Sequence, residues 1–81
     1  MKLPRDISGR ELAKLLKKYD FSVTRQSGSH IRLTSSYMGN THHITIPDHD
    51  PLKLGTSNSI LNDLANYLVL TKEELIDDLL K

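Results

Sequence analysis

The chain has 81 residues, contains no cysteine and carries a formal net charge of +1. This length allows a single small domain, residues 1–81, and the lack of cysteine excludes a disulfide framework and a cysteine-based zinc site. No apolar run approaches the roughly 20 residues that span a bilayer, and no apolar stretch follows the charges of residues 1–6, as a signal peptide requires. We therefore expect a cytoplasmic protein that does not contact membranes.

The charge is unevenly distributed along the chain. Residues 1–53 hold nine Lys and Arg against five Asp and Glu, a net +4, whereas residues 54–81 hold two against five, a net −3. A basic front half and an acidic tail favour an anionic ligand on one surface and a second partner on another. Such a charge distribution more often reflects only a mixed, solvated surface.

The first predicted element is a helix over residues 8–19. Ser8 and Glu11 have the spacing of a capping box, and Asp20 ends the pattern. Between them apolar residues recur at helical spacing, with lysines at the other positions. The apolar positions are Leu12, Leu15, Leu16 and Tyr19, and the lysines are Lys14, Lys17 and Lys18.

Three strands and two helices are predicted to follow. Residues 21–26, 30–34 and 43–46 alternate with a period of two, as half-buried strands do. After a turn-rich loop, Thr56, Ser57 or Asn58 is expected to cap a second helix, and Thr71 with Glu74 forms the capping box of a third. The apolar stripes of these helices are Ile60, Leu61, Leu64, Ala65 and Leu68, then Leu75, Ile76, Leu79 and Leu80. This order predicts an α+β fold, a three-stranded antiparallel sheet with the helices packed on one face.

The alternation also predicts a register for the first hairpin. Because the apolar residues of its two strands must share the core face, the turn is expected to have three residues, 26–28, with Gly28 in the left-handed conformation. Thr24 then lies opposite His30, and Arg25 is turned to the core side.

The second hairpin is expected to have a two-residue turn, 39–40. This turn places Ser36 opposite His43, and continuation past the third strand brings His49 opposite His30. The open face of the sheet is then predicted to carry Thr24, His30, Arg32, Thr34, His43 and Thr45, with His49 at its margin.

The residues of this face limit the chemistry that it can support. The chain has no cysteine, no serine in a strained elbow motif and no glycine-rich phosphate loop. His42 and His43 point to opposite faces, so they cannot chelate a metal together, and we expect none. RNA cleavage by the substrate's own 2′-hydroxyl fits, because it needs an acid or base and a cation on the phosphate. His30 can supply the first and Arg32 the second.

Residues 25–30, Arg-Gln-Ser-Gly-Ser-His, resemble the R-Q-x-G-S-H signature of the HicA (YcfA-like) toxin family. The resemblance covers nearly the whole chain: residues 15–21 are similar to the family's first helix and strand entry, residues 46–49 to its V-P-x-H stretch and residues 54–61 to its G-T-x-x-x-I-L helix start. It implies a dsRBD-like fold, mRNA cleavage with His30 as the catalytic histidine, and inhibition by a HicB-like antitoxin protein. Asp63 departs from the pattern, because a cation is usual at that position.

We therefore expect a metal-independent endoribonuclease without a cofactor, acting on mRNA and not on DNA, with His30 as general base or acid. His49 is expected to be the second acid or base. Expected RNA contacts are Ser29, Arg32, Lys14, Lys17 and Lys18. Two alternatives stay open: a non-catalytic RNA-binding module of the same fold, and an inactive protein that binds a partner through its acidic tail and the apolar stripe of residues 75–80.

Overall fold

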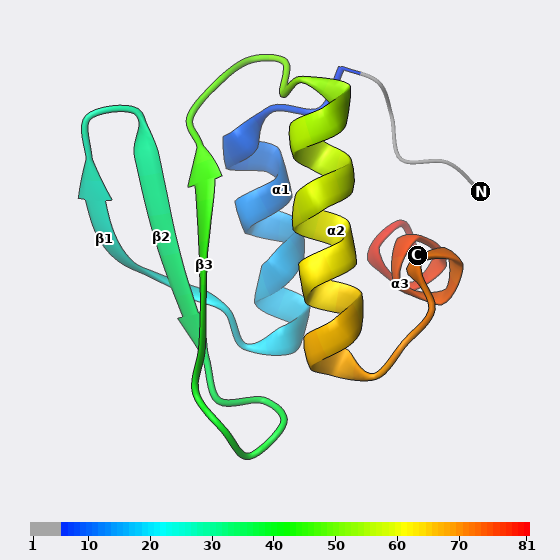
Figure 1. The fold of residues 1–81 in the computed structure, drawn as a ribbon. Helices are drawn as coiled ribbons and strands as arrows, with labels where there is room; N and C mark the ends of the chain where they lie inside the picture. Colours follow the sequence, from blue (N-terminus) through cyan, green and yellow to red (C-terminus); the bar gives the residue numbers. More distant parts are fainter. Residues whose placement is uncertain (1–5) are drawn as a thin grey trace.

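The computed structural model describes residues 6–81 (Figure 1); the expectation about a signal peptide falls mainly on residues 1–5, outside this part. The elements are helix α1 (Gly9–Leu15), 3-10 helix η1 (Leu16–Tyr19), strands β1 (Ser22–Ser27), β2 (His30–Ser35) and β3 (His42–Pro47), and helices α2 (Leu54–Leu68) and α3 (Lys72–Leu79). Within residues 6–81, no helix has the length and apolar character needed to cross a membrane.

The three strands form one antiparallel sheet in the order β1-β2-β3. Helices α1 and α2 lie side by side against one face of the sheet, and α3 lies on the far side of this helix pair (Figure 1). The α+β arrangement predicted from the sequence is therefore confirmed. No described helix covers the second face of the sheet, which is open.

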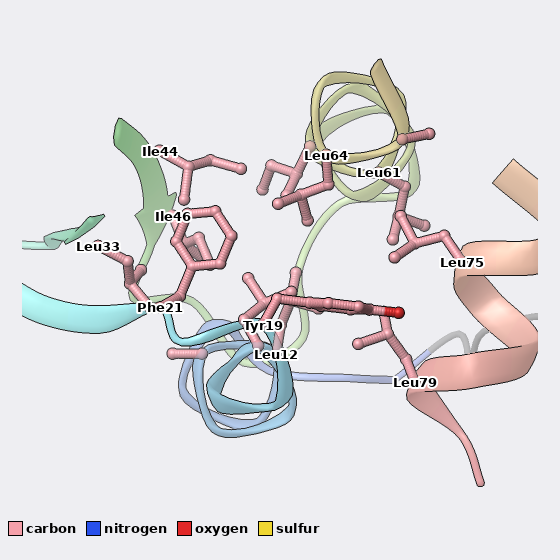
Figure 2. Packing of buried hydrophobic residues seen from close by; sticks show 14 of the residues in the cluster. Leu12, Tyr19, Phe21, Leu33, Ile44, Ile46, Leu61, Leu64, Leu75 and Leu79 are labelled. Atoms are coloured by element: carbon pink, nitrogen blue, oxygen red, sulfur yellow. The ribbon is translucent and has the colours of Figure 1, made fainter. Parts of the chain in front are cut away.

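The buried core lies on both sides of the helix pair. Figure 2 shows Phe21 between sheet residues such as Ile44 and the two helices, and Leu75 packed from α3 against the opposite side of α2. Tyr19 bridges the two regions, and its hydroxyl points toward α3 (Figure 2). Of the predicted stripe on α3, Leu75, Ile76 and Leu79 are buried and Leu80 packs against the core. This stripe is therefore core and not a free docking surface.

Both predicted capping boxes are present. Ser8 and Glu11 cap α1, and Thr71 and Glu74 cap α3, each by reciprocal backbone and side-chain hydrogen bonds. The predicted helix over residues 8–19 is α-helical only to Leu15 and then tightens into η1. Asp20 ends it in the left-handed conformation with φ of 60°, which aspartate tolerates better than most residues.

The predicted start of α2 is wrong. The helix begins at Leu54, and its N-cap is Lys53, which makes no side-chain capping bond. A tertiary contact decides the position: Leu52 is buried, and its N–H donates to the carbonyl of Ile7 at 2.9 Å. The chain is thereby anchored just before the helix, and Ser57 lies inside the helix as a buried residue.

Strand β1 contains a β-bulge, which the sequence does not predict. Val23 pairs with Leu33, but the next pair joins Arg25 to Arg32, so Thr24 is an extra residue in the ladder. An extra residue reverses the face on which the following side chains lie. The prediction that Arg25 faces the core is therefore wrong, because Arg25 lies on the open face with Arg32.

The turn that follows is also shorter than predicted. Ser27 pairs with His30, which leaves a two-residue turn, Gly28 and Ser29, so Thr24 is not opposite His30. Gly28 has φ of 57°, the positive value that the first position of a type II′ turn requires. The left-handed glycine is thus confirmed, and the length of its turn is corrected.

Val23 is less buried than its place in the alternation predicts. It faces the helices and lines a shallow groove with Ala13 and Ile31, yet it stays 52% exposed. The reason is its position on β1, the edge strand that lies farthest from the helices (Figure 1).

The second hairpin has a six-residue loop, 36–41, instead of the predicted two-residue turn, since Ser35 pairs with His42. Tyr67 of α2 holds this loop in place. Its hydroxyl accepts a hydrogen bond from the N–H of Met38 at 3.1 Å and donates to the carbonyl of Asn40 at 2.8 Å. The register therefore differs from the prediction by two residues. Because two is the side-chain period of a strand, every β3 residue keeps its predicted face.

Candidate functional site

His30 is the first residue of β2 and is exposed at the end of the open face. The turn before it is held by the residue that follows β3: the N–H of Asp48 donates to the carbonyl of Ser29 at 2.6 Å. Arg10 in turn binds the Asp48 carboxylate through two guanidinium nitrogens, at 3.0–3.2 Å. Helix α1 therefore supports the hairpin that presents His30.

The ion pair with Arg10 also changes the acidity of Asp48. Hydrogen bonds from the guanidinium, together with its positive charge and a smaller effect of His49, hold the pKa of Asp48 below its ordinary value. Arg10 is thus paired with Asp48 and is not a free cation beside the hairpin.

A shallow depression of about 290 Å³ lies beside His30 on the open face. It is lined by Arg25, Ser27, His30, Arg32 and Thr45, one or two residues from each strand. The register explains this grouping, because Ser27 lies opposite His30 and Arg25 lies opposite Arg32, which in turn lies opposite Thr45.

The depression is strongly basic. Strands β1, β2 and β3 contain no Asp or Glu, and no carboxylate among residues 6–81 forms an ion pair with Arg25 or Arg32. Like charges directly opposite each other on a sheet destabilise it. Two exposed guanidinium groups in this position are therefore suited to an anion that bridges them, such as a phosphate.

A chain of hydrogen bonds crosses the sheet at the other end of the open face. The hydroxyls of Thr24 and Thr34 are 2.8 Å apart, and Thr34 Oγ1 is 2.9 Å from Nδ1 of His43. His43 lies opposite Thr34 and is exposed. The predicted open-face set of Thr24, His30, Arg32, Thr34, His43 and Thr45 does share this face.

His49 does not lie where the sequence predicts. Pro47, the last residue of β3, is opposite His30, so the predicted pairing of His49 with His30 is wrong. Strand β3 ends at Pro47, and Asp48 makes the last backbone bond toward the first hairpin. The carbonyl of His49 instead accepts a hydrogen bond from the N–H of Gly9 at the start of α1, at 2.9 Å. The His49 side chain is exposed and is not part of the depression.

The other predicted RNA contacts are dispersed. Ser29 is in the turn beside His30, but Ser27 and not Ser29 lines the depression. Lys14 on α1 and Lys17 on η1 are exposed and border the groove on the helix side of the sheet. Lys18 binds α3, where its ammonium group donates to the carbonyl of Asp78 at 2.5 Å. The lysines are therefore not part of the His30 site.

Asp63 on α2, the acidic residue at a position where the family usually has a cation, pairs with His42. Asp63 Oδ2 is 3.0 Å from Nε2 of His42, and the His42 ring stacks on Tyr67 with ring centroids 4.5 Å apart. As predicted, His42 and His43 lie on opposite faces. Among residues 6–81, no three His, Asp or Glu side chains gather in a way that could hold a metal ion.

Reasoning from the sequence missed Arg25 and Ser27 as neighbours of His30. The alternation does not reveal this bulge, because every β1 residue after Val23 is polar, so no apolar residue marks the change of face. The available signal was the motif itself, since residues 25–30 carry both Arg25 and Ser27 beside His30.

These features define a class: a small α+β protein whose helices cover one face of a three-stranded sheet and whose other face bears a histidine among arginines. Residues 9–65, which are 57 of the 81, match the family model described as HicA toxin of bacterial toxin-antitoxin. The chain belongs to this family. The comparisons with curated proteins and with solved structures found no match. HicA proteins are the toxins of toxin–antitoxin pairs and are generally RNases.

Proposed function

We propose that this protein is an endoribonuclease that cleaves mRNA at the open face of its sheet, with His30 as general base or acid and without a metal. The observation that carries the proposal is the grouping of His30, Arg25 and Arg32 around one depression. A histidine and two guanidinium groups are what phosphodiester cleavage by an internal nucleophile needs.

In the proposed reaction the 2′-hydroxyl of the substrate gives its proton to a base and its oxygen attacks the adjacent phosphorus. The bond from phosphorus to the 5′-oxygen of the next nucleotide breaks, and that oxygen takes up a proton. The products are a 2′,3′-cyclic phosphate and a 5′-hydroxyl end. His30 serves as the base or supplies the proton, and water serves the other role.

Arg25 and Arg32 are proposed to hold the two non-bridging oxygens of the phosphate. Charge on these oxygens increases in the transition state, so fixed guanidinium donors stabilise it more than the ground state. The bulge at Thr24 supports this role for Arg25, because it turns Arg25 to the side of the sheet on which Arg32 and His30 lie.

The remaining predicted contacts have lesser roles in the proposal. Ser29, Lys14 and Lys17 are proposed to contact phosphates outside the cleaved bond. Lys18 is left out, because it binds Asp78. His49 is left out of the catalytic group because Pro47, not His49, lies opposite His30.

The antitoxin is proposed to be HicB-like and to inhibit by covering the open face. Strands without a single acidic residue favour an acidic or hydrogen-bonding surface on the inhibitor. Chemical-shift mapping of the complex should move the resonances of Thr24, His30, Arg32 and His43. Shifts confined to residues 71–80 would contradict this proposal.

Purified protein incubated with a short single-stranded RNA in the presence of EDTA tests the enzymatic activity. Wild-type protein should give products with 2′,3′-cyclic phosphate ends, and folded His30→Ala should give none. A wild-type protein that binds the RNA without cleaving it would instead be a non-catalytic RNA-binding module. Cleavage by His30→Ala at the wild-type rate would exclude His30 from the reaction.

A further inference from the structure

His43 lies on the same face as His30, near the other end of the sheet. Its partner across the ladder is Thr34, four residues from His30 along β2. At about 3.3 Å per residue this separation is about 13 Å, which is too long for both histidines to act on one phosphodiester. The depression beside His30 accordingly does not include His43. If His43 contacts the substrate, it contacts a flanking nucleotide.

A direction can be assigned to the hydrogen bonds around His43 from the acceptor at the end of the chain of bonds. The carbonyl of Arg32 can only accept, so the hydroxyl of Thr24, 3.5 Å away, donates to it. Each hydroxyl has one proton, so this starting point assigns Thr34 as the donor to Thr24 and Nδ1–H of His43 as the donor to Thr34, at distances of 2.8 and 2.9 Å. In the neutral ring the proton is thus on Nδ1, and Nε2 carries a free lone pair.

This arrangement selects the kind of group that His43 can bind. An unprotonated Nε2 accepts a hydrogen bond and repels phosphate oxygens, so its partner must be a donor. The open face also lacks Phe, Tyr and Trp, the large aromatic side chains on which proteins stack bases. Tyr19 and Phe21 are buried in the core, Tyr37 packs on Tyr19, and Tyr67 packs against His42. A ribose 2′-hydroxyl is the donor that every nucleotide presents without base stacking.

We propose that His43 is a substrate-binding residue whose Nε2 accepts a hydrogen bond from the 2′-hydroxyl of a nucleotide flanking the cleaved bond. The inference rests on the proposed RNA-cleaving function and extends it. His43 thereby contributes to the selection of RNA over DNA at a position remote from the reacting atoms. Thr24 and Thr34 are positioning residues, because they hold Nδ1 and so orient the ring.

The test is a double-mutant cycle between His43 and single 2′-fluoro substitutions, which remove the donor. The substrate is a short RNA with one cleavage site, substituted in turn at each flanking nucleotide. For wild-type protein, the 2′-fluoro substitution at one of these positions should lower kcat/KM about 3- to 10-fold, the scale of one hydrogen bond. In His43→Ala the unsubstituted RNA should show the same loss, and the substitution should add nothing further. His43→Gln, which keeps an acceptor, should retain part of the sensitivity.

Additive effects at every flanking position, or a wild-type kcat/KM for His43→Ala, would overturn the proposal. If the wild-type protein does not cleave RNA, the proposed function has failed, and the same cycle measured by binding anisotropy decides the role of His43 separately. A further readout is the imidazole ¹⁵N spectrum of the free protein. It should show the neutral His43 protonated on Nδ1 and altered tautomer populations in Thr34→Val, whereas a wild-type ring protonated on Nε2 would contradict the inference.

Discussion

Arg25 and Arg32 lie directly opposite each other on the open face of the sheet, and no carboxylate among the described residues pairs with either. Side chains in this relationship are close enough for their charges to repel. An anion bound between them would relieve this repulsion, which is why the proposed function assigns the pair to the substrate phosphate.

Arg25→Ala and Arg32→Ala should therefore weaken RNA binding and reduce its dependence on salt. Each lost phosphate contact should change the slope of log Kd against log salt concentration by about 0.7, the value for single strands. Titrations of a labelled RNA at several salt concentrations measure this slope. Lys81→Ala is the matched control, because it removes one positive charge from an exposed residue outside the depression, and its slope should equal that of the wild type. An unchanged slope in both test variants would show that the pair does not bind phosphate.

Gly9→Ala should destabilise the fold. A Cβ at Gly9 would collide with the backbone carbonyl of Pro47, so α1 must move away from the end of β3. Overpacking of this kind costs about 1–3 kcal/mol. Gly55→Ala is the matched control, because a Cβ there meets nothing within 4 Å and alanine favours the helix by up to about 1 kcal/mol. Urea denaturation should thus give changes of opposite sign in the free energy of unfolding. Equal stabilisation by both variants would contradict the close contact.

Tyr19→Phe should reduce the sensitivity of the protein to acid. The Tyr19 hydroxyl donates to Asp78 and, with help from Lys18, lowers the pKa of that carboxyl below its ordinary value. A lowered pKa in the folded state contributes stability above about pH 4, and this contribution is lost as the pH falls further. Thermal unfolding between pH 7 and pH 2 should show a smaller acid-induced fall in Tm for Tyr19→Phe than for wild type. Tyr37→Phe, which keeps the ring contact with Tyr19, should behave like wild type; identical profiles for all three proteins would contradict the role of the hydroxyl.

His49→Ala should leave RNA cleavage within about twofold of wild type. The backbone carbonyl of His49 accepts a hydrogen bond from Gly9, which the substitution leaves in place. The exposed side chain of His49 does not line the depression. Loss of a true general acid or base lowers the rate about 10²- to 10⁴-fold. A decrease of that size in the single-turnover rate of folded His49→Ala would restore it as the second catalytic group.

The sequence alone was sufficient to predict the elements and the face on which His30 lies. Capping boxes at Ser8 and Thr71 marked two helix starts correctly, because they satisfy backbone amides locally. The start of α2 could not be predicted in the same way. It is determined by the buried Leu52 and its bond to Ile7, which are distant in sequence.

Alternation determined which side chains of β2 and β3 share a face, but it could not determine which of them are neighbours. A shift of two residues leaves every side chain on its face, so the pattern is equally compatible with His49, or with Pro47, opposite His30. In the observed register, residues 36–41 form a loop that the Tyr67 hydroxyl binds through two backbone hydrogen bonds. Only the tertiary structure therefore separated His49 from His30. It also placed Arg25 beside Arg32, because one extra residue at Thr24 reverses the face of the chain that follows it.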